Sequence, residues 1–203
     1  MIEAIVLDIG GVILRTEDRS GRQSLERKYS LPPGGPEALV FNSEPAAQST
    51  IGKVGQDQIW QNIADELKLT PAELEDFSQT FWQGDQIDLE LIRYLENQRG
   101  TFTTALLSNA WVGMREILAD QYQIVEGETV DHILISAELG VAKPDPRIYQ
   151  ILASTINCQF DRILFVDDFI ENIDAANELG IQTIHYQPGM DLINRIHMKV
   201  DQN

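Results

Sequence analysis

The sequence predicts an α/β protein with a doubly wound parallel sheet and a second, smaller helical domain. Three features predict it: short apolar runs that stop abruptly at polar residues, amphipathic segments between those runs, and one long stretch that interrupts their rhythm. Continuous apolar runs are typical of strands buried on both faces, as in a parallel sheet. Strands that alternate with helices are joined by right-handed crossovers, which favour a doubly wound arrangement.

Five apolar runs are the expected strands. They cover residues 5–7, 105–107, 133–135, 163–166 and 181–184. The polar residues that directly follow them are Asp8, Ser108-Asn109, Ser136, Asp167-Asp168 and His185. Ligands of open α/β sheets bind outside the carboxyl ends of the strands, so these polar residues are the first candidates for a functional site.

Two helices between or after these strands carry clear signals at their ends. Asp145 is the expected N-cap of a helix whose first residue is Pro146, and residues 148, 151, 152 and 156 form its apolar face. Residues 172–179 are expected to form a short helix that ends at Gly180, because glycine readily adopts the left-handed conformation after a helix.

The stretch from residue 16 to residue 85 is far longer than one crossover requires. It begins with a charged segment containing Gly and Pro, followed by apolar residues at helical spacing at positions 59, 63 and 67. Thr70 and Glu73 then form a capping box before residues 74, 77 and 81, which give the next helix an apolar face. We therefore expect a sheet domain made of residues 1–15 and 86–203 and a helical cap of residues 16–85.

Composition narrows the class of protein. The 203 residues are 43% hydrophobic and 23% charged, which excludes a mainly disordered or collagen-like chain. Fifteen Lys and Arg against 32 Asp and Glu give a net charge of −17, which disfavours binding to nucleic acid or anionic membranes. The single cysteine, Cys158, cannot form an internal disulfide, and neither a basic leader nor an apolar run of ~18–20 residues is present, so we expect a cytoplasmic protein.

The strand ends bring carboxylates together. Asp8, Asp167 and Asp168 would converge with the Ser108 hydroxyl at one edge of the sheet. Carboxylates this close repel one another unless a cation lies between them, and oxygen ligands suit a hard ion such as Mg²⁺, often shared with a substrate phosphate. Lys143 is the obvious counter-charge.

These residues lie in four segments whose order resembles the motifs of the haloacid dehalogenase superfamily, in the subgroup with a helical cap after the first motif. The segments are residues 5–12, 106–109, 143–146 and 165–168, the last followed by Asn172. The resemblance covers essentially the whole chain. It implies a Rossmann-like core with a small α-helical cap, and the activity of a Mg²⁺-dependent phosphatase on small phosphate monoesters such as sugar phosphates.

The resemblance also implies roles for the first motif and for the metal site. Asp8 would attack phosphorus and form an aspartyl phosphate that water hydrolyses. Mg²⁺ would be held by Asp8, by Asp168, by the backbone carbonyl of Gly10, and by Asp167 either directly or through water.

The same family pattern assigns the phosphate-binding groups. Ser108, Asn109 and Lys143 would bind the remaining phosphoryl oxygens. The partner would be a small phosphorylated metabolite, chosen by the cap. In the cap, Lys53 is either a contact for an anionic substrate or an ordinary exposed loop residue. Trp111 is either a wall of the pocket or a packing residue.

The sequence departs from the family pattern at Gly10. Family phosphatases usually carry a second Asp there as general acid and base, a role worth ~10²–10⁴-fold in rate. Glu17 and Asp18 are possible substitutes, although solvated residues at a domain hinge are the simpler interpretation. His132, His185 and His197 have no nucleophile signature beside them, so we expect no catalytic role for them.

Gly10 keeps a second function open, a catalytically weak relative that binds a phosphorylated ligand or a protein partner. A third alternative is a 2-haloacid dehalogenase that uses the same Asp8. That reaction displaces a halide and needs no metal. No cation would then offset the repulsion between the neighbouring carboxylates of Asp167 and Asp168, which disfavours this alternative.

Overall fold

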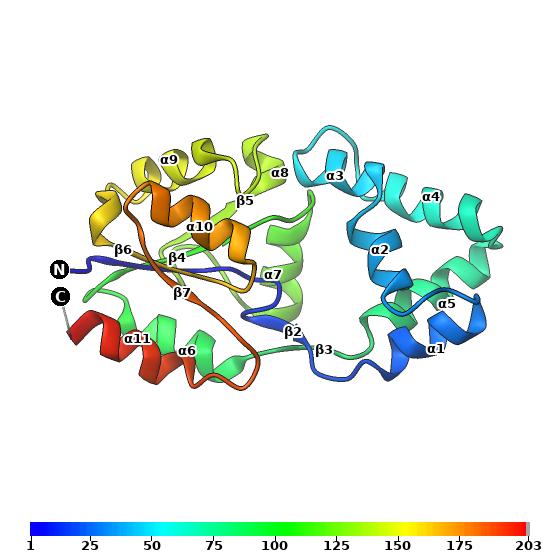
Figure 1. The fold of residues 1–203 in the computed structure, drawn as a ribbon, viewed down its shortest axis with the longest axis horizontal. Coiled ribbons are helices and arrows are strands. Elements are labelled where there is room, and N and C mark those ends of the chain that lie inside the picture. Colours follow the sequence, from blue (N-terminus) through cyan, green and yellow to red (C-terminus); the bar gives the residue numbers. More distant parts are fainter. Residues whose placement is uncertain (202–203) are drawn as a thin grey trace.

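The computed structural model describes residues 1–201, and its core is a five-stranded parallel sheet in the order β5-β4-β1-β6-β7 (Figure 1). The strands are β1 (Ala4–Leu7), β4 (Thr103–Ser108), β5 (His132–Ile135), β6 (Ile163–Asp167) and β7 (Gln182–His185). The chain leaves the central strand β1 toward β5 and then returns to place β6 on the other side of β1. This reversal of strand order puts the end of β1 where ligands bind in such sheets.

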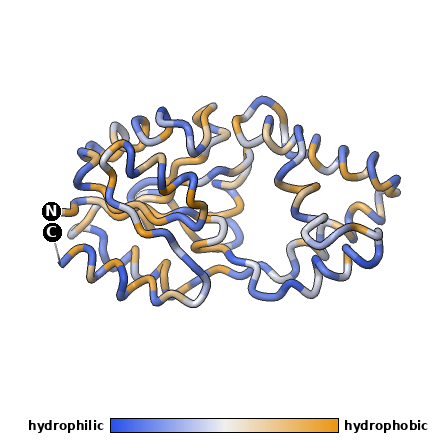
Figure 2. The backbone as a smooth tube through the Cα atoms, in the orientation of Figure 1, coloured by the Kyte–Doolittle hydropathy of each residue, from blue (hydrophilic) through white to orange (hydrophobic). Residues whose placement is uncertain are grey.

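Helices cover both faces of the sheet, which confirms the predicted α/β fold (Figure 1). The face that includes Ile5 and Leu7 packs against α6 (Leu89–Gln98), α7 (Met114–Tyr122) and α11 (Leu192–Asp201). The opposite face packs against α9 (Pro146–Thr155) and α10 (Ile170–Glu178). Alternate residues of a strand point to opposite faces, so both faces of β1 are apolar and fully buried. Figure 2 shows the hydrophobic residues concentrated along these central strands.

The local signals at the helix ends are mostly confirmed. The Asp145 side chain accepts a hydrogen bond from the backbone N–H of Arg147 at the start of α9. Gly180 follows α10 with φ +86°, as expected of a glycine that ends a helix. α10 begins at Ile170, two residues earlier than expected, and β6 and β7 include Asp167 and His185 as their last residues.

The inserted stretch folds into five helices with their own hydrophobic cluster, which includes Ile59, Ile63, Phe77 and Phe81. The helices are α1 (Ser20–Lys28), α2 (Gly35–Phe41), α3 (Glu44–Thr50), α4 (Asp57–Leu67) and α5 (Pro71–Trp82). The last two correspond to the predicted helices, and the capping box at the start of α5 is present. The sequence did not predict α1, α2 and α3.

Two short strands, β2 (Leu14–Thr16) and β3 (Asp85–Ile87), pair antiparallel where the chain enters and leaves the inserted helices. Each strand crosses one of the expected domain limits, at residues 15/16 and 85/86. These limits stay a prediction. A short 3-10 helix (Phe160–Arg162) precedes β6, and α8 (Ser136–Leu139) follows β5. Among residues 1–201 no helix is both long and apolar enough to span a bilayer.

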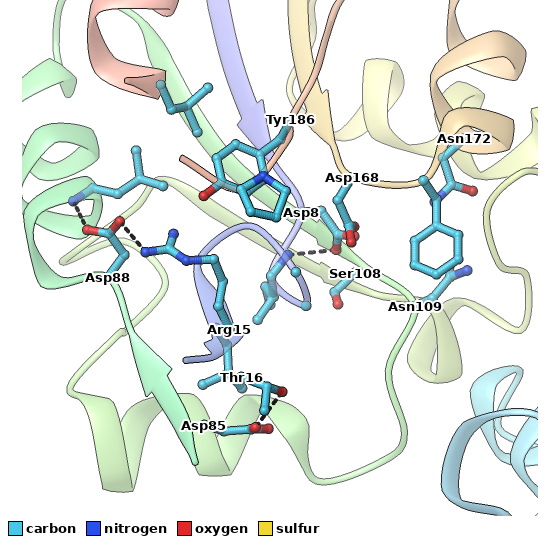
Figure 3. A pocket seen from close by; sticks show the side chains of 18 of the residues that line it. Asp8, Arg15, Thr16, Asp85, Asp88, Ser108, Asn109, Asp168, Asn172 and Tyr186 are labelled. Atoms are coloured by element: carbon cyan, nitrogen blue, oxygen red, sulfur yellow. Dashed lines mark hydrogen bonds and ion pairs between the residues drawn. The ribbon is translucent and has the colours of Figure 1, made fainter. Parts of the chain in front are cut away.

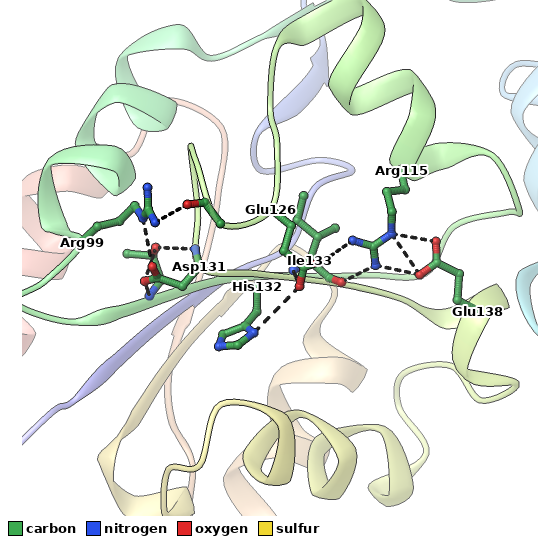
Figure 4. A network of polar contacts seen from close by, with 9 residues as sticks. Arg99, Arg115, Glu126, Asp131, His132, Ile133 and Glu138 are labelled. Atoms are coloured by element: carbon green, nitrogen blue, oxygen red, sulfur yellow. Dashed lines mark hydrogen bonds and ion pairs between the residues drawn. The ribbon is translucent and has the colours of Figure 1, made fainter.

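The edge strand β5 is covered by a network of charged side chains (Figure 4). Arg115 donates to the carbonyl of Ile133 at 2.6 Å, and Glu126 accepts from the N–H of Ile133 at 3.1 Å. Arg115 also forms ion pairs with Glu126 at 2.5 Å and with Glu138 at 2.7 Å. These contacts occupy backbone groups that would otherwise be free to pair with another chain.

We expect Arg115→Ala to lower the free energy of unfolding by about 1–2 kcal/mol, because it removes a hydrogen bond to a strand carbonyl and two ion pairs. It should also promote self-association through β5. Urea unfolding and light scattering at several protein concentrations measure the two effects. Arg147→Ala is the matched control, since Arg147 is highly exposed and pairs only with its neighbour Asp145. Equal behaviour of the two variants would contradict the protective role.

Candidate active site

Three carboxylates meet at the end of β1, as the sequence predicted. Asp8 follows β1 and Asp168 follows the neighbouring strand β6 (Figure 3), and Asp167 is the last residue of β6. One oxygen from each side chain lies within 4.8 Å of the others. β1 and β6 pair in register, Leu7 with Val166, so the two strands deliver their acids at the same level. Such a group can hold a metal ion.

The Lys143 ammonium lies between two of these acids, and its side chain is fully buried. Its Nζ is 2.6 Å from Asp167 Oδ2, 3.0 Å from Asp8 Oδ2 and 2.9 Å from the carbonyl oxygen of Leu107. An ammonium has three N–H donors, so these three acceptors satisfy it completely. Lys143 is therefore the counter-charge of the buried acids in this state of the protein.

Asp167 is saturated by donors from the protein. Beyond Lys143, its carboxylate accepts hydrogen bonds from the Phe169 N–H at 2.8 Å and from Asn172 Nδ2 at 3.0 Å to both oxygens. The residue is completely buried. These contacts fix the loop after β6 and leave Asp167 poorly suited to a direct metal contact.

Asp168 has the opposite character. Its Oδ1 is buried and has no hydrogen-bond partner among the described residues. Burial raises the pKa of this carboxyl, and the negative charge of Asp167 raises it further. An unpartnered buried carboxylate oxygen is unfavourable unless a cation neutralises it. Asp168 is therefore the acid with a free ligand atom.

Two glycines of the first motif differ in what they allow. A Cβ on Gly11 would lie 2.1 Å from Asp168 Oδ2, and Gly11 has φ +77°, so this position requires glycine for both space and conformation. Gly10 has no positive φ, and a Cβ there would meet nothing within 4 Å. A side chain at position 10 is therefore sterically allowed.

Burial shifts the titration of Asp8. Its pKa is raised to about 7, chiefly by burial and also by Asp167, while Lys143 opposes the shift. Asp8 Oδ1 accepts a hydrogen bond from the Ile9 N–H at 2.6 Å. A divalent cation beside this carboxylate would favour its ionised form and so supply an anionic nucleophile at neutral pH.

Ser108 and Asn109 occupy different positions in the site. Ser108 is 4% exposed and lines the cleft above the carboxylates. Asn109 uses both polar atoms of its side chain on Lys143: Nδ2 donates to the Lys143 carbonyl and Oδ1 accepts from the Lys143 N–H, each at 2.8 Å. The side chain that the resemblance assigned to phosphate thus holds the Lys143 segment in place.

A cleft of about 1750 Å³ separates the sheet from the inserted helices and contains these residues. Glu17 lines it but pairs with Arg15 at 2.8 Å, and Asp18 does not line it and instead accepts two hydrogen bonds from Ser20. Neither acid is positioned beside Asp8 as a free proton donor.

The remaining candidates also have defined surroundings. Trp111 both lines the cleft and packs against the cluster of the inserted helices, so each interpretation of it holds. Lys53 is exposed and does not line the cleft. His185 Nε2 lies 3.0 Å from the Asp168 carbonyl, and His197 packs on the ring of Tyr94. His132 lies 3.8 Å from Glu126, away from the cleft.

Known proteins resemble this chain over its whole length. The family model of the haloacid dehalogenase-like hydrolases matches residues 2–180. A D-ribitol-5-phosphate phosphatase of Bacteroides thetaiotaomicron is 27% identical, with 94% of this chain and 95% of the phosphatase covered. The bifunctional epoxide hydrolase 2 of Rattus norvegicus is 33% identical over 41% of this chain, a match that spans only 15% of that longer protein.

Solved structures share the fold. A haloacid dehalogenase family enzyme of Bacteroides thetaiotaomicron, crystallised with magnesium and inorganic phosphate, superposes with a TM-score of 0.76. The match covers 94% of this chain and 97% of that one, at 19% sequence identity. At this identity the likeness establishes the common fold.

Ser136 connects the inserted helices to the sheet domain. No sequence motif indicated this contact. Its Oγ donates to the Thr50 carbonyl at 2.7 Å and accepts from the Ala110 N–H at 3.0 Å, and the residue is fully buried. Thr50 ends α3, and Ala110 lies two residues after Ser108. One hydroxyl thus joins the cap to the loop beside the carboxylates.

We expect Ser136→Ala to lower the free energy of unfolding by about 1–3 kcal/mol, because it leaves the Thr50 carbonyl and the Ala110 N–H without their partner. Chemical denaturation provides the measurement. Ser20→Ala is the control, since Ser20 is exposed and bonds only to nearby Asp18. A Ser136→Ala protein as stable as Ser20→Ala would rule out the proposed tie between cap and sheet.

Proposed function

We propose that this chain, which belongs to the haloacid dehalogenase-like hydrolase family, is a Mg²⁺-dependent phosphatase of small phosphate monoesters. The observation that carries the proposal is the meeting of Asp8, the buried Lys143 and the unpartnered Asp168 oxygen in one cleft. The 27% sequence identity to a D-ribitol-5-phosphate phosphatase, over 94% of this chain, supports the proposal. So does the shared fold with an enzyme that binds magnesium and inorganic phosphate.

The residues at the end of β1 fit a hard divalent cation. The donor set consists of oxygens, and Asp168, which belongs to the acid cluster, has a buried Oδ1 without a hydrogen-bond partner among the described residues. Asp8 and Asp168 would hold Mg²⁺, with the backbone carbonyl of Gly10 as a further ligand. When bound, Mg²⁺ neutralises charge on the phosphoryl oxygens and orients the group for attack. Asp167 would not contact the metal directly. It would position Lys143 and Asn172 through its hydrogen bonds with them.

The chemistry then belongs to Asp8. A carboxylate oxygen of Asp8 attacks phosphorus in line, a new O–P bond forms, and the P–O bond to the alcohol breaks. Water hydrolyses the resulting aspartyl phosphate, which releases inorganic phosphate and restores the carboxylate. Ser108 donates a hydrogen bond to a phosphoryl oxygen, while Lys143 favours the ionised form of Asp8.

The departing alkoxide needs a proton, and Gly10 provides none. Glu17 is held by Arg15 and Asp18 does not line the cleft, so neither of the two acids that follow the first motif is placed to take over this role. Alkyl esters, whose leaving groups need protonation, should therefore react more slowly than aryl esters. The same feature supports the second candidate function, a protein that binds a phosphorylated ligand and turns it over weakly.

Asp8→Asn should lower turnover of an aryl phosphate at least about 10³-fold, because an amide cannot form the aspartyl phosphate. Steady-state hydrolysis of p-nitrophenyl phosphate with Mg²⁺ measures it, and circular dichroism checks the fold. Asp174→Asn is the control, a like substitution at an exposed position of α10 outside the cleft. Substantial hydrolysis by a folded Asp8→Asn protein would eliminate the covalent route.

Asp168→Asn and Asp167→Asn should fail in different ways. Asp168→Asn should weaken Mg²⁺ binding at least about tenfold while leaving the metal-free protein as stable as before, since burial already disfavours its charge. Asp167→Asn should lower the free energy of unfolding by about 3 kcal/mol, because it removes a partner of the buried Lys143. Calorimetric Mg²⁺ titration and thermal unfolding distinguish them. Unchanged Mg²⁺ affinity in Asp168→Asn would refute the metal assignment.

Gly10→Asp should raise turnover of alkyl phosphates by up to ~10²-fold and flatten the dependence on leaving-group pKa, since the new carboxyl can protonate the alkoxide. The backbone at this position accepts a side chain without a clash. Gly10→Asn is the matched control, equal in size but unable to act as an acid. A flat profile in the wild type would mean that a donor is already present. Undetectable turnover of every ester, with phosphate still bound, would favour the binding protein.

A further inference from the structure

We infer that the leaving group of the substrate carries no second negative charge and presents a flat apolar face to Phe41, Trp82 and Trp111. This inference rests on the proposed function and narrows it to a class of substrate. Two independent features of the cleft carry it: an aromatic surface that the fold leaves accessible, and the pairing of each Lys and Arg side chain that lines the cleft among the described residues.

The aromatic surface comes from both parts of the chain. Phe41 ends α2, Trp82 ends α5 and Trp111 follows β4, and all three line the cleft. Ring centroids lie 5.9 Å apart for Phe41 and Trp82, 6.2 Å for Phe41 and Trp111, and 6.4 Å for Trp82 and Trp111. We call these three residues the aromatic wall.

Phe41 shows that the aromatic wall is more than packing between the two parts of the chain. Phe81, whose ring centroid lies 5.6 Å from that of Phe41, is completely buried, whereas Phe41 is 45% exposed. Leaving a large ring this open sacrifices the free energy that burial would supply. A ligand that covers the Phe41 ring would gain this burial free energy, so the exposed face of Phe41 favours an apolar ligand.

The aromatic wall lies within reach of the phosphate site along the same loop. Trp111 comes directly after Ser108, Asn109 and Ala110, and all four residues line the cleft. The Ser136 hydroxyl holds this loop at Ala110 and the cap at Thr50. A group esterified to a phosphate beside Ser108 would therefore extend toward the aromatic wall.

Each Arg and Lys side chain of the cleft already lies against at least one acid. Arg15 lies 2.8 Å from Glu17 and 2.9 Å from Asp88, and Arg22 lies 2.8 Å from Asp85. The complete set of pairs is Arg15 with Glu17 and Asp88, Arg19 with Glu26 and Glu37, Arg22 with Asp85 and Glu37, and Lys143 with Asp8 and Asp167. A carboxylate or second phosphate on the leaving group would have to compete with these acids for each Arg and Lys of the cleft.

Further acids strengthen this exclusion. Glu90, Glu171 and Asp191 also line the cleft and add negative charge to it. An anionic leaving group would meet repulsion from these acids, whereas a neutral one would not. Charge thus excludes bisphosphates and phosphorylated acids, and the aromatic wall selects for an apolar or ring-shaped leaving group among the neutral ones.

Three alkyl phosphates test the inference at similar leaving-group chemistry. We would measure kcat/KM for benzyl phosphate, 4-carboxybenzyl phosphate and glycerol 3-phosphate in the presence of Mg²⁺. The wild type should prefer benzyl phosphate to each of the others by about three- to tenfold, the range expected of aromatic contacts. Phe41→Ala should reduce the benzyl-to-glycerol ratio about threefold or more, mainly through KM. Val112→Ala, at an exposed neighbour outside the cleft, is the control.

A binding measurement separates this inference from the proposed function. All three tryptophans of the chain are in or beside the aromatic wall, since Trp60 lies 6.5 Å from Trp82, so their fluorescence reports on occupancy. Benzylphosphonate, which cannot be hydrolysed, should change this fluorescence in the wild type at lower concentration than in Phe41→Ala.

The outcomes are distinct. If benzylphosphonate binds more weakly to Phe41→Ala and no ester is hydrolysed, the phosphatase is refuted. The assignment of Phe41 to a surface that binds a neutral, apolar group next to the phosphate then stands. Hydrolysis of all three esters at equal kcat/KM would keep the phosphatase and overturn the assignment. A Phe41→Ala protein that lowers kcat/KM equally for benzyl and glycerol esters would also overturn it.

Discussion

The buried ammonium of Lys143 is the interaction on which the site depends. Three carboxylates lie within 4.8 Å of one another at the end of β1, and two of them contact this one cation. Burial is unfavourable for charged groups unless they are paired, and Lys143 offsets this cost by contacting both Asp8 and Asp167, while Phe169 N–H and Asn172 also donate to Asp167. Asp168 Oδ1 has no such partner among the described residues, and this imbalance is the basis of our proposal that the cluster holds a further cation.

In our proposal the sheet supplies the reacting groups and Trp111, and the inserted helices supply the rest of the aromatic wall. The strand ends of the sheet place Asp8, Ser108 and Asp167 rigidly, because β1, β4 and β6 are adjacent and parallel. The inserted helices contribute Phe41 and Trp82 on the other side of the cleft. The antiparallel pair β2 and β3 connects the two parts, and the Ser136 hydroxyl joins them at the loop beside Ser108. We therefore expect substitutions at Phe41 and Trp82 to change the contacts of the leaving group without moving the acids.

Sequence alone predicted the sheet, the converging acids and the helices with regular apolar spacing, because these follow from local patterns. It missed α1, whose buried face is Gly21, Arg22 and Leu25, since a glycine and a paired arginine give no apolar period. A Cβ on Gly21 would lie 2.4 Å from the Thr80 carbonyl, so only the packed structure explains that glycine. The differing roles of Asp167 and Asp168 likewise depend on hydrogen bonds between distant segments, which no local pattern encodes.

The central claim is that Asp8 becomes covalently phosphorylated, and trapping that species tests it most directly. Enzyme mixed with a fast substrate and Mg²⁺ would be quenched in acid within the first turnovers and reduced with borohydride, which converts a phosphorylated aspartate to homoserine. Peptide mass spectrometry should then find homoserine at position 8 only when substrate was present. Steady turnover with an unmodified Asp8 in every quenched sample would contradict the account.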